Sequence, residues 1–323
     1  MSSPTRQRFQ YASVNRNTVN VWLFLRAATA LPNCPEALVG HRISGNTCFY
    51  FGDFAGAHEH FQKTVELYDQ TRHADFADRF GHDPREGAEA FDALALWVLG
   101  AVDEALRLTG RALADAGSSA HAPTMAHALN IAALLGLVRR NPEAVATYSQ
   151  ALADIVSRYD LPAYWAGLAV FFQGWAKWCD GAEESRLAGM RRGLAICREQ
   201  GLVWFLPNFE AALAEAEARA GEIDVGLKRL DDALAESGRT EQRWYEAEMH
   251  RIRAGLLLTR DPADTAAAEQ SLQIAIAVAQ SQKARSFELR AALSLAKLYR
   301  AANRDIDAHA VLAPAVEGFP STQ

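Results

Sequence analysis

The sequence lacks the short motifs on which common enzyme classes depend. It has no GxxxxGK[ST] segment, so it offers no Walker A loop to hold phosphates. It has no HExxH and no GxSxG motif, and it shows no strand-rich segment with paired aspartates of the kind a nucleotide cyclase needs. We therefore expect a protein that is not an enzyme, with no catalytic residue, no cofactor and no bound metal.

Paired cysteines and long apolar runs are also missing. Cys34, Cys48, Cys179 and Cys197 are scattered without CxxC spacing, which favours reduced thiols in a cytoplasmic protein. No apolar run approaches the ~20 residues that span a bilayer. The patch 19–25 is too short and too polar at its flanks for a signal peptide. We expect no membrane partner.

Positive charge is sparse. The formal net charge is -6 and the pI is about 5.9, and the only basic clusters are short pairs such as Arg139-Arg140 and Arg191-Arg192. A protein that binds nucleic acid generally has a basic stripe. Nucleic acid is therefore excluded as an expected partner. The composition, 50% hydrophobic and 22% charged, is that of an ordinary folded protein.

The segment 41–69 has the pattern of one antiparallel helical hairpin. Gly45 lies in the first apolar segment, Gly52 and Asp53 interrupt it, and Ala57 and Phe61 follow at helical spacing. Small residues allow two helices to approach closely, and Phe61 is expected to fill the gap between them.

The same plan recurs at roughly 40-residue spacing, which is typical of a helical solenoid. Small residues recur a few positions into the second helices, at Ala57, Ala105, Ala144, Ala268 and Ala308. We predict an all-α, tetratricopeptide-like right-handed superhelix of about seven hairpins. After 41–69, the expected helix pairs are 88–99 with 102–116, 125–138 with 142–159, 164–179 with 183–200, 208–220 with 223–237, 245–259 with 263–280, and 286–301 with 305–316.

The two ends are expected to differ from the repeats. Residues 1–17 are polar and aperiodic, which predicts disorder, and 317–323 read as a frayed tail. The solenoid is expected over 18–316, beginning with a half-unit helix at 18–30. In the fourth hairpin Arg186 stands where a small residue is expected, so this hairpin is predicted to cross less tightly.

The seventh unit carries a resemblance to tetratricopeptide repeats. Leu295, Ala296 and Tyr299 lie in its first helix, and Ala308, Leu312 and Ala315 in its second. The resemblance implies a helical scaffold that binds a partner along its concave face. The units here are longer than the usual ~34 residues of that repeat.

A second resemblance covers the chain from about residue 20 onward. The segments that carry it are YDQTRHADFADRFGHDP (68–84), LALWVLGAVDEAL (94–106), QRWYEAEMHRIRAGLLL (242–258) and SFELRAALSLAKLYR (286–300). They resemble the C-terminal repeat region of bacterial signalling proteins that carry a class III adenylate or guanylate cyclase or a DNA-binding domain, followed by a STAND-type AAA ATPase. The resemblance implies a regulatory role in signal transduction. Neither the cyclase nor the ATPase part is present.

The linker after the first hairpin contains the most distinctive polar cluster, Arg79, His82 and Asp83. One hypothesis is a loop that projects into the groove and recognises a ligand or a domain. The other is a structural turn, in which Gly81 permits an unusual backbone and Asp83 caps a helix that Pro84 begins. We favour the turn.

Aromatic residues of the first helices form a second candidate site. Alignment on the turn glycines places Phe49, Trp97, Phe171, Trp175 and Trp178 on the groove side. Aromatic side chains serve as binding anchors, but they also fill the space between repeats. We favour core packing, except in the fourth unit, where Phe171, Trp175 and Trp178 together exceed one alanine-sized gap. Further tryptophans, Trp165, Trp204 and Trp244, stand near helix starts.

Two charged patterns complete the candidates. Arg243, Glu246, Glu248 and Arg251 form a mixed-charge face with a Glu248–Arg251 pair at i,i+3 spacing; a solvated face is the default, and a polar ligand or peptide contact is the alternative. The run His58-Glu59-His60 invites a metal hypothesis, but neighbouring residues on a helix point in different directions, so we expect the imidazoles to diverge.

The leading hypothesis is a non-enzymatic protein-interaction or regulatory module that binds a partner protein or peptide on its concave face in bacterial signal transduction. The first alternative is a sensor that binds a small-molecule effector inside the superhelix. The second is a detached regulatory tail of an adenylate cyclase or ATPase. The candidate binding residues are Phe49, Arg79, His82, Asp83, Trp97, Phe171, Trp175, Trp178, Arg243, Trp244, Glu248 and Arg251.

Overall fold

The computed structural model describes residues 37–181, 184–203, 205–317 and 319. Within them the chain forms fifteen α-helices and no strand. The expectations for 1–17 and 18–30, for Trp204 and for the tail at 320–323 lie outside the described residues, as does the side chain of Arg186. No described helix combines the length and the apolar character needed to cross a bilayer.

Fourteen of the helices form seven consecutive pairs, and the short α4 (Phe76–Phe80) lies in the linker after the first pair. The pairs are α2 (Ala37–Phe51) with α3 (Phe54–Leu67), α5 (Pro84–Leu99) with α6 (Val102–Ser118), α7 (Ala122–Val138) with α8 (Pro142–Arg158), α9 (Ala163–Cys179) with α10 (Glu184–Glu199), α11 (Leu206–Arg219) with α12 (Ile223–Thr240), α13 (Glu246–Arg260) with α14 (Thr265–Ser281), and α15 (Arg285–Ala301) with α16 (Asp305–Glu317). The predicted hairpins are confirmed, with boundaries that agree within a few residues.

Capping residues explain where several helices begin and end. The Asp83 carboxylate accepts hydrogen bonds from two backbone N–H groups in the first turn of α5, and Pro84 occupies the start of that helix. In α8 the Asn141 side chain accepts one such hydrogen bond, from the Ala144 N–H, and Pro142 occupies the start of the helix. Gly100 ends α5 at a φ of 97°, a left-handed conformation that glycine adopts without steric cost. These local signals made the hairpins readable from sequence.

Small residues lie where the two helices of a hairpin cross. A Cβ at Gly45 would lie 2.5 Å from the Phe61 ring, so Phe61 fills the gap left by Gly45, as predicted. Of the five recurring alanines, four are fully buried, and Ala144 is the half-buried exception. In that hairpin Val145 takes the buried position and packs against Gly136.

The fourth hairpin crosses at backbone contact. A Cβ on Gly193 of α10 would lie 2.5 Å from the Phe171 nitrogen and 2.6 Å from the Gly167 oxygen, both on α9. The expectation of a looser crossing, which rested on Arg186, is therefore wrong. The contact is made further along α10, where the chain has glycine.

First and second helices have different surroundings. First helices contact the first helix of a neighbouring hairpin in the pairs α2–α5, α5–α7, α7–α9, α11–α13 and α13–α15, whereas second helices pack mainly on first helices. The first helices thus form an inner layer and the second helices an outer one. This arrangement is consistent with an α-solenoid.

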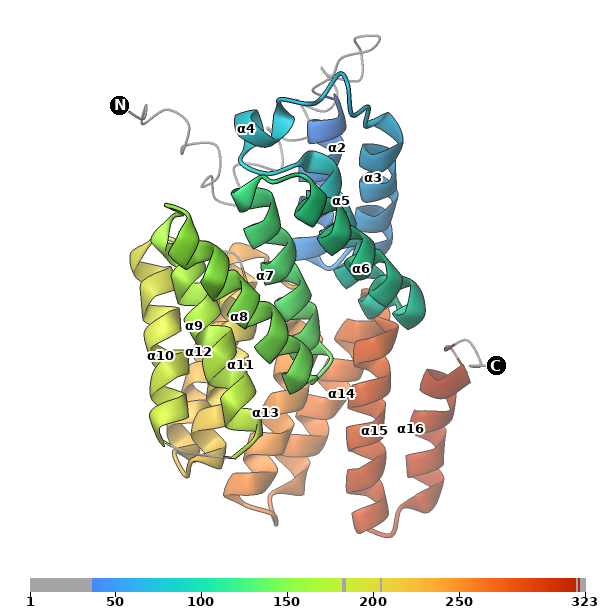
Figure 1. Cartoon of the computed structure of the whole chain (residues 1–323). Helices are drawn as coiled ribbons and strands as arrows, with labels where there is room; N and C mark the ends of the chain where they lie inside the picture. The colour runs from blue at the N-terminus through green and yellow to red at the C-terminus, as the bar shows by residue number, and fades with distance from the viewer. Residues whose placement is uncertain (1–36, 182–183, 204, 318, 320–323) are drawn as a thin grey trace.

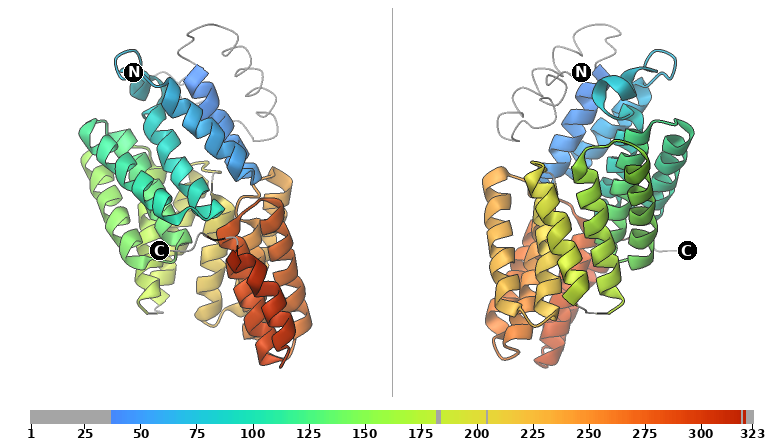
Figure 2. Two further views of the ribbon diagram at one scale, coloured as in Figure 1. Left: turned by 90° about the vertical axis from the view of Figure 1, so that its right-hand side faces the viewer. Right: turned by 60° about the vertical axis from the view of Figure 1, so that its left-hand side comes forward.

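The array of hairpins curves until its two ends meet. In Figure 1 the blue hairpin α2–α3 lies above the red hairpin α15–α16, and the views in Figure 2 agree. The backbone N–H groups of Arg243 and Trp244 donate to the carbonyl of Tyr50, at 2.7 and 3.1 Å. Farther along, the Ser286 hydroxyl donates to the carbonyl of Trp97 at 2.6 Å. The first two hairpins therefore rest on the last two.

We predict that Gly193→Ala lowers the free energy of unfolding by about 1–3 kcal/mol, because the added methyl meets backbone atoms that cannot rotate away. Urea unfolding followed by circular dichroism measures the change.

Gly110→Ala in α6 is the matched control. A Cβ at Gly110 meets nothing within 4 Å, so the substitution should stabilise the protein by about 0.5–1 kcal/mol through helix propensity. Equal effects at the two positions would contradict the close crossing.

Candidate functional site

An aromatic core fills the inner space between the first hairpins and the sixth. We define it as Phe49, Tyr50, Phe91, Phe205 and Trp244, whose exposed fractions are all 6% or less. The Phe49 ring lies 5.1 Å from Trp244 and 5.6 Å from Phe91, and the Tyr50 ring lies 5.4 Å from Phe205. Such contacts stabilise by about 0.5–1.5 kcal/mol each beyond area burial. Phe49 and Trp244 are therefore core residues here, not the lining of an open groove.

The aromatic residues of the fourth hairpin are buried as well. Phe171, Trp175 and Trp178 are 1%, 1% and 4% exposed. The expectation that they line an open groove is wrong, because the fifth hairpin covers them. Phe209 of α11 lies 4.7 Å from Phe171, and the Arg219 guanidinium lies 4.9 Å from the Trp178 ring.

The linker residues make structural contacts. Asp83 caps α5, as the turn hypothesis predicted. His82 stacks on His127 of α7 with ring centroids 4.2 Å apart and planes within 7°. Arg79 lies over the Phe76 ring at 4.9 Å. The linker thus packs against its own neighbours and does not project away as a recognition loop.

An arginine cluster gathers on the inner helices. It comprises Arg140, Arg251 and Arg290 with Glu215 and Glu248. Glu248 accepts hydrogen bonds from Arg251, Nη2 to Oε1 at 2.7 Å and Nε to Oε2 at 3.0 Å, and from Arg290, Nη1 to Oε1 at 3.4 Å. The Arg140 Nη2 atom lies 3.9 Å from the same Oε1, and its Nη1 donates to Glu215. Three guanidinium groups therefore converge on one carboxylate.

Four hairpins contribute to the cluster. Arg140 follows α7, Glu215 lies on α11, Glu248 and Arg251 lie on α13, and Arg290 lies on α15. The Glu248 side chain is 0% exposed, whereas those of Arg140, Arg251 and Arg290 are 32%, 22% and 25% exposed. The arginine side chains are therefore partly exposed, whereas the carboxylate that holds them is not.

Sequence reasoning found part of this cluster. The predicted Glu248–Arg251 pair is confirmed, but the expected solvated face is wrong for Glu248, whose side chain is 0% exposed. Arg140 and Arg290 were missed because they come from the third and seventh hairpins, and no local spacing connects them. Arg290 also lies 4.9 Å from the ring of Trp97, which is 5% exposed. Trp97 is a sequence candidate that the structure brings to the edge of the cluster.

Burial and charge act in opposite directions on Glu248. Desolvation raises the pKa of its carboxyl, but the charges and hydrogen bonds of Arg251, Arg290 and Arg140 outweigh it and lower the pKa to about 2. Glu248 therefore stays ionised and keeps the three arginines oriented.

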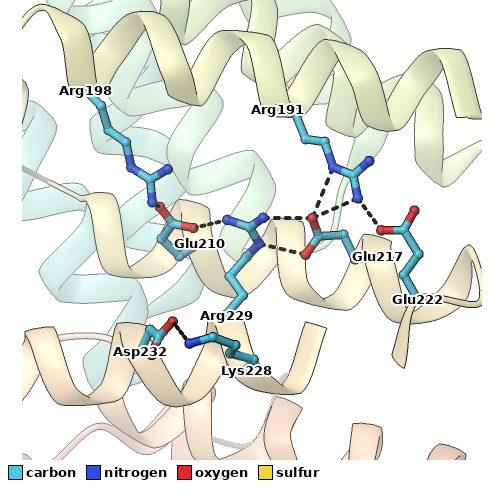
Figure 3. Close-up of polar contacts among 8 residues, drawn as sticks. All are labelled: Arg191, Arg198, Glu210, Glu217, Glu222, Lys228, Arg229 and Asp232. Atoms are coloured by element: carbon cyan, nitrogen blue, oxygen red, sulfur yellow. Dashed lines mark hydrogen bonds and ion pairs between the residues drawn. The ribbon is translucent and has the colours of Figure 1, made fainter. Parts of the chain in front are cut away.

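A second ionic network joins α10, α11 and α12 (Figure 3). Its members in order are Arg198, Glu210, Arg229, Glu217, Arg191 and Glu222. Arg229 bridges the buried carboxylates of Glu210 and Glu217 at 2.8 and 2.6 Å. Three cations meet three anions, so this network is balanced. We interpret it as a structural bridge between the fourth and fifth hairpins.

The histidines of the HEH run point to different helices. The Nδ1 atom of His58 lies 2.7 Å from the Asp92 carboxylate on α5, and that of His60 lies 3.0 Å from His41 on α2. The predicted divergence of the imidazoles is confirmed. Among the described residues, no group of three or more potential ligands is placed to hold a metal ion.

A small cavity lies where the first hairpin meets the sixth. Its volume is about 300 Å³, and Gly52 and Asp53 line it opposite Arg243 and Lys283. The Arg243 guanidinium is already paired with Glu246, Nε to Oε2 at 2.7 Å. The volume is at the lower end of the ~300–1,000 Å³ range of ligand pockets.

Comparison with known proteins leaves the function open. No family model matches the chain. Over 282 residues the chain is 28% identical to the uncharacterized protein R02095 of Rhizobium meliloti (strain 1021). The match covers 85% of this chain and 27% of that protein, so the chain spans about a quarter of the length of its relative.

We predict that Glu248→Gln lowers the free energy of unfolding in a pH-dependent way. Because the folded pKa of about 2 lies below the ordinary value of about 4.5, the stabilisation is present above pH ~4.5 and is lost as the pH falls toward 2. The deficit relative to wild type should be about 2–3 kcal/mol at pH 7 and should fall by about half between pH 5 and pH 3. Urea titrations at each pH measure it.

Glu236→Gln serves as the control, because Glu236 pairs with Arg239 on the exposed face of α12. It should change stability by less than about 0.5 kcal/mol at each pH. A deficit for Glu248→Gln that does not vary with pH would show that the charge of Glu248 is not what holds the cluster.

Proposed function

We propose that the chain is a non-enzymatic recognition module, a tetratricopeptide-like right-handed superhelix that binds a partner protein or peptide on its inner face. The arginine cluster is the observation that carries the proposal, because it brings together partly exposed arginine side chains from three hairpins. Arginine is enriched at the energetic centres of interfaces. A role in bacterial signal transduction rests on the resemblance to the repeat regions of cyclase and ATPase signalling proteins.

The proposed contact surface continues from the cluster along two inner helices. Gly255 follows Arg251 by one turn on α13, and Leu293 and Lys297 follow Arg290 on α15. Gly255 and Lys297 are exposed, and Leu293 is 41% exposed. We call Arg251, Gly255, Arg290, Leu293 and Lys297 the inner strip. Cationic and apolar groups together suit a partner segment with acidic and apolar side chains.

A small-molecule effector is the second candidate, and the cavity at the junction of the ends supports it. A ligand there would touch the turn of the first hairpin through Gly52 and Asp53, and the sixth hairpin through Arg243 and Lys283. It would therefore bind across the contact that closes the array. A ligand that binds the folded state raises the melting temperature without a protein partner.

The partner proposal is tested by a steric block that leaves every arginine in place. A Cβ at Gly255 meets nothing within 4 Å, so Gly255→Tyr adds bulk to the inner strip without disturbing the core. Gly238→Tyr on the outer helix α12 is the matched control, since Gly238 is equally open. Each variant is used as bait, and any captured protein is purified and titrated against each bait by calorimetry.

We expect Gly255→Tyr to weaken binding of the purified partner at least tenfold and Gly238→Tyr to leave it unchanged. Loss of binding in Gly238→Tyr alone would move the interface to the outer face and refute the proposal. A melting-temperature rise with a small metabolite, with no saturable protein partner for any bait, would favour the effector alternative.

A further inference from the structure

The arginine cluster has far more hydrogen-bond donors than acceptors. Three guanidinium groups carry about fifteen N–H donors. Four of their hydrogen bonds to Glu248 and Glu215 are accounted for. Each arginine side chain is between 22% and 32% exposed, so the cluster is partly open to solvent at its arginines.

The charges of the cluster do not balance. Arg140, Arg251 and Arg290 contribute +3 and Glu215 and Glu248 contribute −2, which leaves +1. Two more charged groups, Asp180 at the end of α9 and Arg219 on α11, act on the Cys179 thiol together with Arg140 and Glu215. They add one charge of each sign, and the surplus remains +1. The network of Figure 3, by contrast, has none.

A buried donor at the end of α9 is an independent observation. Trp178 is 4% exposed, and its indole Nε1 has no hydrogen-bond acceptor among the described residues. The Arg219 guanidinium lies over its ring, and the next residue, Cys179, is within the electrostatic range of Arg140. Leaving a buried N–H without a partner costs about 1–3 kcal/mol. Trp178 therefore adds an unpaired donor at the end of α9, one residue from the thiol on which Arg140 acts.

We propose that the arginine cluster is a binding site for an oxyanion, a phosphate or carboxylate group. The fork of a guanidinium matches two oxygens of such a group, and the surplus positive charge would be neutralised by it. The buried Glu248 acts as the positioning residue, since it fixes Arg251 and Arg290 while remaining out of reach of solvent. The inference rests on the proposed function, in which a partner presents the anionic group; free phosphate offers the same chemistry.

Inorganic phosphate and acetate are the probes. Each is titrated at pH 7.5 and constant ionic strength, because screening by salt would otherwise mimic competition. Calorimetry and thermal unfolding are recorded for wild type and for Arg290→Gln, which leaves the two hydrogen bonds between Arg251 and Glu248 intact. Arg290→Lys keeps the charge but removes the fork. Arg239→Gln, on the exposed face of α12, is the control for loss of one positive charge.

We expect saturable binding of phosphate or acetate to wild type and to Arg239→Gln, a loss of at least tenfold in Arg290→Gln, and an intermediate loss in Arg290→Lys. Equal binding to all four proteins, or no saturable binding of either probe, would overturn the proposal. Arg290→Lys keeps the test decisive should Arg290→Gln fail to fold, as circular dichroism would reveal.

Two peptides, identical except that one carries phosphoserine and the other glutamate at a single position, show whether the site takes an anionic group presented by a partner or a free ion. Binding of either peptide at least tenfold tighter than its free anion supports a group presented by a partner, and binding no tighter than free phosphate supports a free ion at the same site. If Gly255→Tyr abolishes partner binding while neither anion and neither peptide binds to wild type, the proposed function is supported and the oxyanion site is refuted.

Discussion

The contact between the two ends of the hairpin array is the constraint on which the rest of the structure depends. In a solenoid each repeat usually buries its apolar face against its neighbours alone. Here two backbone N–H groups, of Arg243 and Trp244, also donate to the carbonyl of Tyr50. The aromatic core around Phe49 and Phe205 fills the space that this closure encloses. Inner helices therefore become core helices over part of their length, and α5 and α11 are buried almost throughout.

Closure also buries polar groups of the inner helices, and these groups then need partners. A carboxylate on a buried helix must be paired, because an isolated buried charge costs several kcal/mol. Glu217 and Glu248 both have 0% exposed side chains, and arginines from other helices hold both of them. The pairs Arg191–Glu217 and Arg290–Glu248 cross between neighbouring hairpins, so they hold these hairpins together as well as neutralising charge. Removing one partner would leave the other buried and unpaired, which is why both networks are sensitive to single substitutions.

The sequence allowed the hairpins to be predicted because their signals are local. Asp83 with Pro84 acts at one helix start and Gly45 with Phe61 acts within one hairpin, and both were found where expected. The Glu248–Arg251 pair was local too. Closure of the array is not local, since it joins Tyr50 to Trp244 and Trp97 to Ser286. Trp244 lies at this closure and is core because of it, a burial that no local spacing in the sequence indicates.

The difference between the two ionic networks argues for function in one and structure in the other. The network around Arg229 alternates its charges and ends balanced, as a bridge between two hairpins requires. The arginine cluster has one more cation than it needs to neutralise Glu248 and Glu215, and its arginine side chains are partly exposed. A structural role would be met by fewer arginines, because Arg251 alone satisfies Glu248 at both oxygens. An anion bound there would contact the third, sixth and seventh hairpins together, so binding would resist any opening of the array.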